Sequence, residues 1–289
     1  MQTNAPETMG VIYRLQLSQL HPHPQNPFSI RDDQAMLDLI QSVQSHGVLV
    51  PAIARPRPDG EYEIIAGHRR KHASELAGLD FMPVVVLDLN DDEAIIQLVD
   101  SNIQRENILP SERAKAYKMR MEAMKRQGAR TDLTSPNISA KFRSDDELGQ
   151  EVGVSGDTIR NYASLTNLVP ELMQMVDEGR IKLSPAYQIA ALSSNEQSLL
   201  LDTIESEQAT PSLSQAQRMK RLSQSGDLIE DVLLEIMMEQ KKPVRNDITL
   251  SGEKLRKYFP KSYSPIQMEN VIFKLLEAWQ RKRQRDQSR

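Results

Sequence analysis

The sequence contains no cysteine, which excludes a disulfide framework, a thiolate metal site and a cysteine nucleophile. Aromatic residues make up only 4% of the chain against 39% hydrophobic residues, which indicates a helix-rich protein with modest cores. No apolar run approaches the length that crosses a membrane, and the first residues lack the apolar segment of a signal peptide. We therefore expect a cytoplasmic protein without a membrane partner, with two or three domains in its 289 residues.

Charge is distributed unevenly along the chain, although the formal net charge is only −4. Residues 87–107 contain six acidic residues and a single basic one, whereas residues 113–143 contain nine basic residues and two acidic ones. A segment like the second one can contact phosphates even in a protein that is acidic as a whole. The distribution therefore favours a nucleic-acid partner for this part of the chain.

A glycine at residue 67 stands where a strand-like segment, 61–65, gives way to a short helix that ends at Gly78. Glycine at such a turn lets the backbone approach a ligand closely, and the free N–H groups of the new helix favour an anion. Arg69 and Arg70 lie in the first turn of this helix, with few acids nearby. The pattern predicts a phosphate site, with an ordinary solvated basic helix face as the alternative.

Motifs for metal binding or catalysis are scarce in the sequence. His68 and His72 have the i, i+4 spacing of zinc ligands, but no glutamate follows His68, and Arg69 and Lys71 would repel a cation. The sequence also lacks the clustered carboxylates that would hold two metal ions, which argues against a nuclease. No catalytic residue can be assigned on these grounds.

The hydrophobic periodicity divides the chain into a mixed N-terminal part and a helical remainder. We predict strands over 11–17, 52–55, 61–65 and 82–87, and an extended loop over the proline-rich residues 21–27. Helices are predicted from an Asp32 or Asp33 cap to Gly47, and over 67–78, 91–107, 111–127, 170–178, 184–192, 195–207, 213–223, 227–240 and 265–285. The predicted domains are a leader at 1–12, an α/β unit at 13–108, a basic helix and linker at 109–135, a DNA-binding unit at 136–210 and a helical segment at 211–289 with a role in dimerisation. The expected fold class is α+β: a small mixed-sheet domain, then an all-α domain and a helical C-terminal segment.

Residues 145–164 have the pattern of two short helices joined by a tight turn, with Gly153 in the turn and Ser155 placed to cap the second helix. In a DNA-binding helix-turn-helix, the second helix enters the major groove. Its exposed positions would be Gly156, Asp157, Arg160, Asn161 and Ser164. The predicted DNA contacts are Ser155, Asp157, Thr158, Arg160 and Asn161, with Lys141 and Arg143 from the basic segment. Arg160 and Asn161 would specify the sequence; an ordinary helical hairpin is the alternative.

Four features in order resemble ParB-type partition proteins. Residues 67–73, Gly-His-Arg-Arg-Lys-His-Ala, resemble the family's Gly-Glu-Arg-Arg-x-Arg-Ala box, and residues 101–105, Ser-Asn-Ile-Gln-Arg, resemble its Glu-Asn-x-Gln-Arg box. Residues 47–53 resemble the segment that begins Gly-x-x-Gln-Pro, and a helix-turn-helix follows at the family's distance. The resemblance covers about residues 13–210 and implies a ParB/sulfiredoxin-like N-terminal domain. Residues 211–289 resemble the C-terminal segments of partition-like proteins from mobile elements of Gram-positive bacteria.

This resemblance implies a nucleotide-dependent mechanism. The family binds CTP with magnesium and closes a homodimer into a clamp on DNA with an inverted-repeat site, and partition systems include a ParA-type ATPase. Carried over to this chain, the nucleotide contacts would be Gly67, His68, Arg69, Arg70, Asn102, Gln104 and Arg105, with Asn102 as the magnesium ligand. On a helix over 91–107, Leu98, Asn102 and Arg105 would share one face, which would present the polar groups to the site. The implied function is a segregation protein associated with the nucleoid.

The chain departs from the family pattern at several of these positions. Ser101 replaces the glutamate that the family links to hydrolysis, so the resemblance leaves a weak CTPase activity open. His68 and His72 replace a glutamate and an arginine, Val50 replaces a glutamine, and Phe28 stands where an arginine often follows an Asn-Pro pair. A regulator of transcription or conjugation that has lost its dependence on nucleotide is therefore the alternative function.

Overall fold

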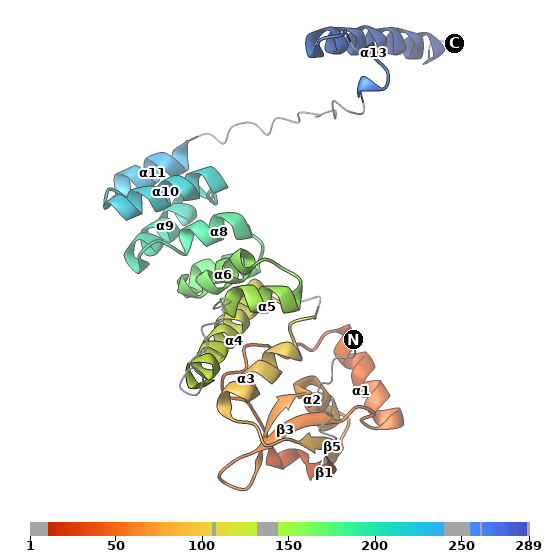
Figure 1. The fold of residues 1–289 in the computed structure, drawn as a ribbon, viewed down its shortest axis with the longest axis vertical. Helices are drawn as coiled ribbons and strands as arrows, with labels where there is room; N and C mark the ends of the chain where they lie inside the picture. Colours follow the sequence, from red (N-terminus) through yellow and green to blue (C-terminus); the bar gives the residue numbers. More distant parts are fainter. Residues whose placement is uncertain (1–10, 106–107, 132–143, 240–254, 261, 288–289) are drawn as a thin grey trace. The chain divides into compact units, whose positions relative to one another are not determined.

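The computed structural model describes residues 11–105, 108–131, 144–239, 255–260 and 262–287. The chain forms two compact units, Met1–Glu239 and Gln240–Arg289. The first unit begins with a mixed sheet flanked by helices and continues as a series of helices (Figure 1). This arrangement confirms the predicted α+β class.

Five strands form one mixed sheet in the order β1-β5-β3-β4-β2. The strands are β1 (Ile12–Gln16), β2 (Leu20–Pro22), β3 (Ala52–Pro56), β4 (Tyr62–Ala66) and β5 (Phe81–Val86). β1 runs antiparallel to β5 and β3 antiparallel to β4, whereas β3 is parallel to β5 and β2 is parallel to β4. Four strands were predicted, but the loop prediction is wrong for the start of 21–27. A three-residue strand tolerates Pro22 there because β2 lies at the edge of the sheet.

The sheet is covered on both faces at β4, which explains why two successive isoleucines of this strand are buried. Ile64 and Ile65 are fully buried, and successive residues of a strand point to opposite faces. Ile64 packs with Met82 and Val84 of β5, whereas Ile65 packs with Leu98 of α3 (Asp91–Asp100). β4 is therefore the strand that connects the sheet core to α3.

Two helices near the sheet, α1 (Gln34–His46) and α2 (His68–Leu76), pack together. Met36 and Val43 of α1 and Ala73 of α2 form the buried contact. Asp33 caps α1 as predicted, because its carboxylate accepts the backbone N–H of Met36 at 2.9 Å. This cap brings Asp33 close to the first turn of α2, where Arg69 donates to it at 3.1 Å.

The helix α3 is shorter than predicted. It ends at Asp100, and the backbone N–H of Asn102 bonds to the Val99 carbonyl at 3.0 Å instead of the Leu98 carbonyl. The Asn102 side chain takes the Leu98 carbonyl itself, with its Nδ2 donating at 2.8 Å. Asparagine at such a position competes with the backbone for hydrogen bonds and favours a turn. The helix predicted over 91–107 is therefore wrong for residues 101–105, so Leu98, Asn102 and Arg105 do not share a helical face; residues 106 and 107 lie outside the described residues.

The rest of the first unit is helical. Its helices are α4 (Pro110–Thr131), α5 (Ser144–Val152), α6 (Gly156–Ser164), the 3₁₀ turn η2 (Leu165–Asn167), α7 (Pro170–Asp177), α8 (Leu183–Ile189), α9 (Ser194–Glu207), α10 (Leu213–Ser225) and α11 (Glu230–Met238). The helices predicted here are confirmed, although α11 begins three residues later than expected. Leu172, Ile189, Leu200 and Ile236 belong to one buried cluster that joins α7 to α11. No break in this core marks the boundary expected at residue 211, which stays a prediction.

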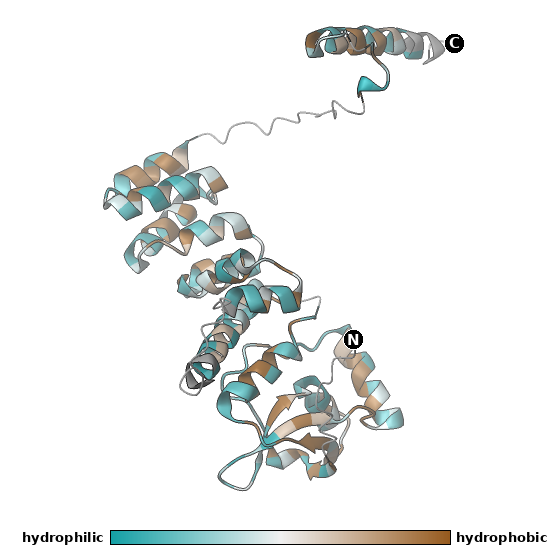
Figure 2. Cartoon of the chain, viewed as in Figure 1, coloured by the Kyte–Doolittle hydropathy of each residue, from teal (hydrophilic) through white to brown (hydrophobic). Residues whose placement is uncertain are grey.

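The second unit contains the long helix α13 (Pro265–Gln287), which confirms the helix predicted over 265–285. Figure 2 shows hydrophobic positions along α13, and the exposed ones include Phe273, Leu275, Leu276 and Trp279. Among the described residues, no helix is both long enough and apolar enough to span a membrane.

Candidate functional site: an arginine-lined cavity and a helix-turn-helix

The turn between β4 and α2 requires glycine. Gly67 is the N-cap of α2 and has a φ of +105°, a left-handed conformation that side-chain-bearing residues rarely adopt. A Cβ atom at this position would lie 2.9 Å from the Cβ atom of Ala52 on the neighbouring strand β3. The strand-to-helix glycine turn is thus as the sequence predicts, and the first N–H groups of α2 lack helical partners and can bind an anion.

Arg69 and Arg70 follow this turn, and each already has a protein partner. Arg69 donates to Asp33 at 3.1 Å, and this hydrogen bond is the main cause that lowers the pKa of the Asp33 carboxyl. Arg70 donates through NH1 to the carbonyls of Val50 and Pro51, at 2.5 and 2.6 Å. Burial lowers the pKa of Arg70. Arg70 therefore fixes the loop before β3, and a ligand could use only its remaining N–H groups.

Arg105 reaches the same region from the segment between α3 and α4. Burial is the main cause that lowers the pKa of Arg105, and the nearby guanidinium groups of Arg69 and Arg70 lower it further, while Glu112 opposes them. The guanidinium groups of Arg69 and Arg70 are thus close enough to that of Arg105 to disfavour its charge. Like charges brought together in a partly buried place are stabilised by a bound anion.

A cavity of about 370 Å³ lies at this cluster. Its lining includes Phe28, Ser29, Arg31, Arg69, Arg105 and Glu112. Of the predicted nucleotide contacts, Arg69 and Arg105 line the cavity, whereas Gln104 is exposed and does not. Its mixture of three cationic side chains with an aromatic ring suits a ligand that carries both phosphates and a planar group.

The sequence did not identify Ser29, Arg31 and Glu112 as site residues. Glu112 is 8% exposed and accepts hydrogen bonds from the backbone N–H and the hydroxyl of Ser29, at 2.9 and 2.5 Å, and from the backbone N–H of Leu109 at 3.1 Å. Arg31 lies 3.8 Å from the same carboxylate. Glu112 lies in the first turn of the helix predicted over 111–127. Its hydrogen-bond partner Ser29 is 83 residues away, and nothing in the sequence connects the two. Glu112 thus joins α4 to the wall of the cavity.

Asn102, the predicted magnesium ligand, is buried in the turn after α3. Its Nδ2 donates to the Leu98 carbonyl and to the hydroxyl of Ser101, at 2.8 and 3.1 Å, so the amide nitrogen is committed to the turn. Within the described part of the chain, no group of three or more His, Asp or Glu side chains could hold a metal ion. The donors present, one amide oxygen and one hydroxyl, fit magnesium only as an ion that shares the phosphates of a nucleotide.

His68 is the first residue of α2 and is only 8% exposed. Burial, followed by the charges of Arg105, His23 and Lys71, lowers the pKa of His68 to about 4. Its Nε2 atom is buried without a hydrogen-bond partner in the structure. The imidazole is therefore neutral at pH 7, with one ring nitrogen available to a ligand or a bound water.

The helix-turn-helix has the predicted turn. Gly153 has a φ of +74°, and a Cβ atom on Gly149 would lie 2.6 Å from the Val154 carbonyl oxygen, so α5 and the turn pack too closely for a side chain there. Ser155 caps α6, as predicted, by accepting the backbone N–H of Thr158 at 3.2 Å. Gly156 is buried, so the prediction that it is exposed on α6 is wrong.

The side chains of α6 differ in how exposed they are and in whether they already bind other residues of the protein. Asp157 and Asn161 are exposed, and Thr158 is partly exposed. Arg160 is bound by two carboxylates, with NH1 donating to Asp145 of α5 and NH2 donating to Asp157. Lys141 and Arg143 lie outside the described residues. The predicted base-contacting arginine thus has an internal role in addition to any contact with DNA.

Several cations of the basic segment are held within the protein. Arg120 is 4% exposed, and its Nε and NH2 atoms lie 2.8 Å from Asp100 of α3 and 2.5 Å from Glu151 of α5. The Nε atom of Arg126 lies 2.7 Å from Asp92. These arginines therefore join α4 to its neighbours through carboxylate partners, and contact of the segment with phosphates stays a prediction. Among the described residues, Lys115, Lys118 and Lys125 are exposed on α4.

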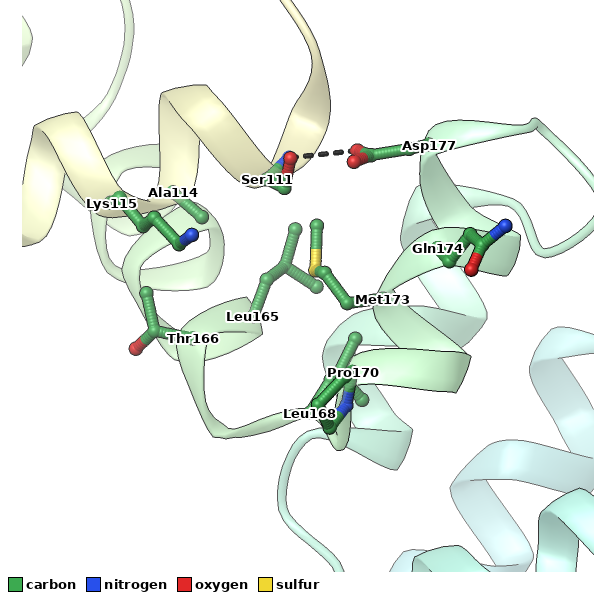
Figure 3. A pocket seen from close by; sticks show the side chains of 10 residues that line it. All are labelled: Ser111, Ala114, Lys115, Leu165, Thr166, Leu168, Pro170, Met173, Gln174 and Asp177. Atoms are coloured by element: carbon green, nitrogen blue, oxygen red, sulfur yellow. Dashed lines mark hydrogen bonds between the residues drawn. The ribbon is translucent and has the colours of Figure 1, made fainter. Parts of the chain in front are cut away.

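A second cavity, of about 340 Å³, lies between α4 and the η2–α7 region (Figure 3). Leu165, Leu168 and Met173 provide its apolar lining, and Lys115 lies at its edge. The carboxylate of Asp177 accepts the backbone N–H of Ser111 at 2.9 Å, which caps the start of α4. This cavity lacks the cluster of arginines found near the Gly67 turn. The residues that line it connect α4 to α7.

Two family models match the chain: the ParB N-terminal domain over residues 1–103 and the ParB HTH domain over residues 137–221. Together they span more than half of the sequence, and the chain belongs to the ParB family. The predicted resemblance to this family is thereby confirmed, while an origin in a Gram-positive mobile element stays a prediction.

The chain is similar to two known proteins and to one solved structure that illustrate this membership. The chromosome-partitioning protein Spo0J of Thermus thermophilus is 32% identical over 187 residues, which cover 65% of this chain and 62% of that protein. Stage 0 sporulation protein J of Bacillus subtilis is 29% identical over 86% of this chain and 79% of its own length. A structure of C-terminally truncated ParB from Caulobacter crescentus complexed with CTP-gamma-S is 29% identical, covers 63% of this chain and 93% of that chain, and has a TM-score of only 0.32, too low to support an argument.

Proposed function

We propose that this protein is a sequence-specific DNA-binding partition protein that uses CTP as a conformational switch. The single observation that carries the nucleotide part is the cavity lined by Arg69 and Arg105, with Arg69 in the first turn of the helix that begins at Gly67. Membership of the ParB family and a helix-turn-helix in the same chain support the DNA part. The proposed partner is double-stranded DNA with an inverted repeat, bound by a homodimer in the cytoplasm at the nucleoid.

In this proposal the triphosphate lies at the N-terminus of α2. The backbone N–H groups after Gly67 and the guanidinium groups of Arg69 and Arg105 bind its oxygens, and the spare N–H groups of Arg70 add to them. Asn102 offers its side-chain oxygen to magnesium, which would neutralise phosphate charge when bound. His68 and Gln104 complete the proposed contacts. Because Ser101 supplies a hydroxyl and no carboxylate, we assign no catalytic residue for hydrolysis.

On the DNA side, α6 enters the major groove in this proposal. Asp157, Thr158, Arg160 and Asn161 face the base edges, and Ser155 lies at the start of the helix near the backbone. The exposed lysines of α4, together with Lys141 and Arg143, contact phosphates and set the orientation of the protein. The exposed apolar positions of α13 serve dimerisation, and a ParA-type ATPase is the proposed protein partner.

The switch depends on a difference in affinity. A nucleotide can shift the protein towards a closed state only by as much as it binds that state more tightly. The route for such coupling is short in this chain, because Glu112 joins the cavity wall to α4, and Arg120 joins α4 to α3 and α5. DNA and CTP should therefore each raise the affinity for the other.

A calorimetric titration of CTP and magnesium, with and without a duplex that the protein selects from a random pool, tests this function. We expect CTP to bind, and to bind more tightly when the selected duplex is present. Selective DNA binding with no heat of CTP binding in either condition would leave the alternative, a nucleotide-independent regulator of transcription or conjugation. Ser101 is the observation that favours that alternative.

A further inference from the structure

We propose that Asp157 and Asp145 are specificity-determining residues that position the guanidinium of Arg160 to contact a guanine and prevent the end of α6 from binding DNA indiscriminately. The inference rests on the proposed DNA-binding function. It starts from the two carboxylates that Arg160 contacts, one on each of its terminal nitrogens.

The two carboxylates differ in burial. The Asp145 side chain is 7% exposed and that of Asp157 is 81% exposed, while Arg160 between them is 39% exposed. Asp145 lies in the first turn of α5, so its pairing with Arg160 fixes the arginine to the neighbouring helix. Asp157 is three residues before Arg160 on α6 itself. A long, flexible side chain is thereby held in one orientation before DNA arrives, which reduces the entropy it loses on binding.

The pairing leaves enough donors for a base. A guanidinium has about five N–H groups. The hydrogen bonds to Asp145 and Asp157 use one N–H group on each terminal nitrogen, so the guanidinium has a second N–H group on each of them for a base. Guanine presents two acceptors, N7 and O6, in the major groove, and a bidentate arginine is their most common partner. No other base pair offers two acceptors on one base in that arrangement, so a fixed Arg160 selects guanine.

The same carboxylates disfavour contact with the DNA backbone. Two negative charges surround one positive charge here, and Asp146 and Glu147 are exposed in the preceding helix. An acidic end of the recognition helix repels phosphates, whereas a guanine edge is uncharged and still accepts hydrogen bonds from Arg160. The carboxylates thus lower the affinity for nonspecific DNA more than the affinity for the specific site. Specificity then comes from making the competing complex unfavourable.

The test compares Asp157→Asn with Glu147→Gln in the full-length chain. Both variants remove one exposed negative charge from the helix-turn-helix, but Asp157 accepts a hydrogen bond from Arg160, whereas Glu147 is an exposed residue of α5. The dissociation constants of each protein are measured at fixed salt for the duplex that the wild type selects and for a scrambled duplex of equal composition. For Asp157→Asn we expect the ratio of the two constants to fall about tenfold, the size of one mismatched base pair. For Glu147→Gln both duplexes should bind slightly more tightly and the ratio should stay constant.

Equal changes in the two variants would show that only net charge matters and would overturn the inference. A repeat selection with Arg160→Lys separates structure from base contact, because lysine keeps the charge and lacks the fork that spans two carboxylates and a guanine. That variant should lose the preference for guanine at one position of each half-site while retaining the others. If the wild type selects no sequence at all, the proposed DNA function fails. Selection that is unchanged in Arg160→Lys overturns the present inference alone.

Discussion

The arginines at the Gly67 turn and the arginines of α4 occupy opposite environments. Arg70 is partly buried and Arg105 is exposed, and for both guanidinium groups loss of solvent is the main cause that lowers the pKa. Arg120 of α4 is more deeply buried, yet it lies between the carboxylates of Asp100 and Glu151. A buried cation that has its carboxylate partner stabilises the fold, whereas a cluster of cations without enough carboxylates is stabilised by an external anion.

This difference shows that the number of basic residues in a segment does not determine how much of its charge a ligand can reach. The segment 113–143 is far more basic than the segment around Gly67. Its arginines at 120 and 126 nevertheless pair with Asp100 and Asp92. Arg160 lies between these cases, because its carboxylate partners leave part of the guanidinium free.

The largest effect should come from removing the arginines that line the cavity. Replacing Arg69 and Arg105 together by alanine should weaken CTP binding at least about a hundredfold, since each hydrogen bond to a charged group contributes about 1.5–3 kcal/mol. The free energy of unfolding should change by less than about 1 kcal/mol, because the Arg69–Asp33 pair is near the surface. Calorimetry and urea unfolding measure the two quantities.

The matched control replaces Lys115 and Lys125, two exposed cations of α4, by alanine and removes the same charge. CTP affinity should then stay close to that of the wild type. A similar loss in both double variants would mean that CTP responds to overall charge, and the distinction between the two regions would disappear.

The sequence predicted the regular elements of the fold because each one has a local cause. The glycine turn at residue 67, the Asp33 cap and the Ser155 cap each depend on residues within a few positions. The ion pairs and the cavity depend on residues that are distant in sequence, such as Ser29 and Glu112. The acidic stretch at 87–107 was visible, but nothing local shows that its aspartates face α4. The sequence therefore predicted Arg69 and Arg105, which line the cavity, but could not predict that Arg31 and Glu112 line it as well.

The next effect concerns the neutral histidine inside the cationic cluster. The folded state lowers the pKa of His68 from 6.5 to about 4, so in this interval an unfolded chain binds a proton that the folded chain does not. Stability is therefore full above pH 6.5 and falls as the pH decreases towards 4, by about 3 kcal/mol from this residue. His68→Gln should remove that part of the decrease when unfolding is measured at pH 7 and pH 4.5.

The control for this measurement is His46→Gln, at the exposed C-terminal end of α1. It should leave the pH dependence of stability close to that of the wild type. If His68→Gln also retains the full decrease, the imidazole does not stay neutral in the folded protein, and the cluster around it is less cationic than the structure indicates.

A smaller loss is expected when the cation that joins α3, α4 and α5 is removed. Arg120→Met keeps the aliphatic contacts but leaves Asp100 and Glu151 without their shared partner. Both carboxylates are close to half exposed, so water replaces part of the interaction, and we expect a loss of about 1–2 kcal/mol in urea unfolding. Lys118→Met, on the exposed side of α4, should cost less than about 0.5 kcal/mol. Equal losses of unfolding free energy in the two variants would mean that Arg120 contributes no more to stability than an exposed lysine. That result would contradict its role in joining α4 to α3 and α5.

The smallest expected effect is the difference in stability loss between alanine substitutions at two glycines that have a positive φ. Gly67 and Gly60 have φ values of +105° and +86°, so alanine is strained at both positions, by about 1 kcal/mol or more. At Gly60 nothing lies within 4 Å of the new Cβ atom, whereas at Gly67 it would lie 2.9 Å from Ala52. Gly67→Ala should therefore cost about 1 kcal/mol more than Gly60→Ala in thermal unfolding. It should also weaken CTP binding, which Gly60→Ala should not affect, because the contact with Ala52 displaces the first N–H groups of α2 from the arginines. If both variants bind CTP like the wild type, the anion does not lie at the start of α2, and the arginines alone would define the site.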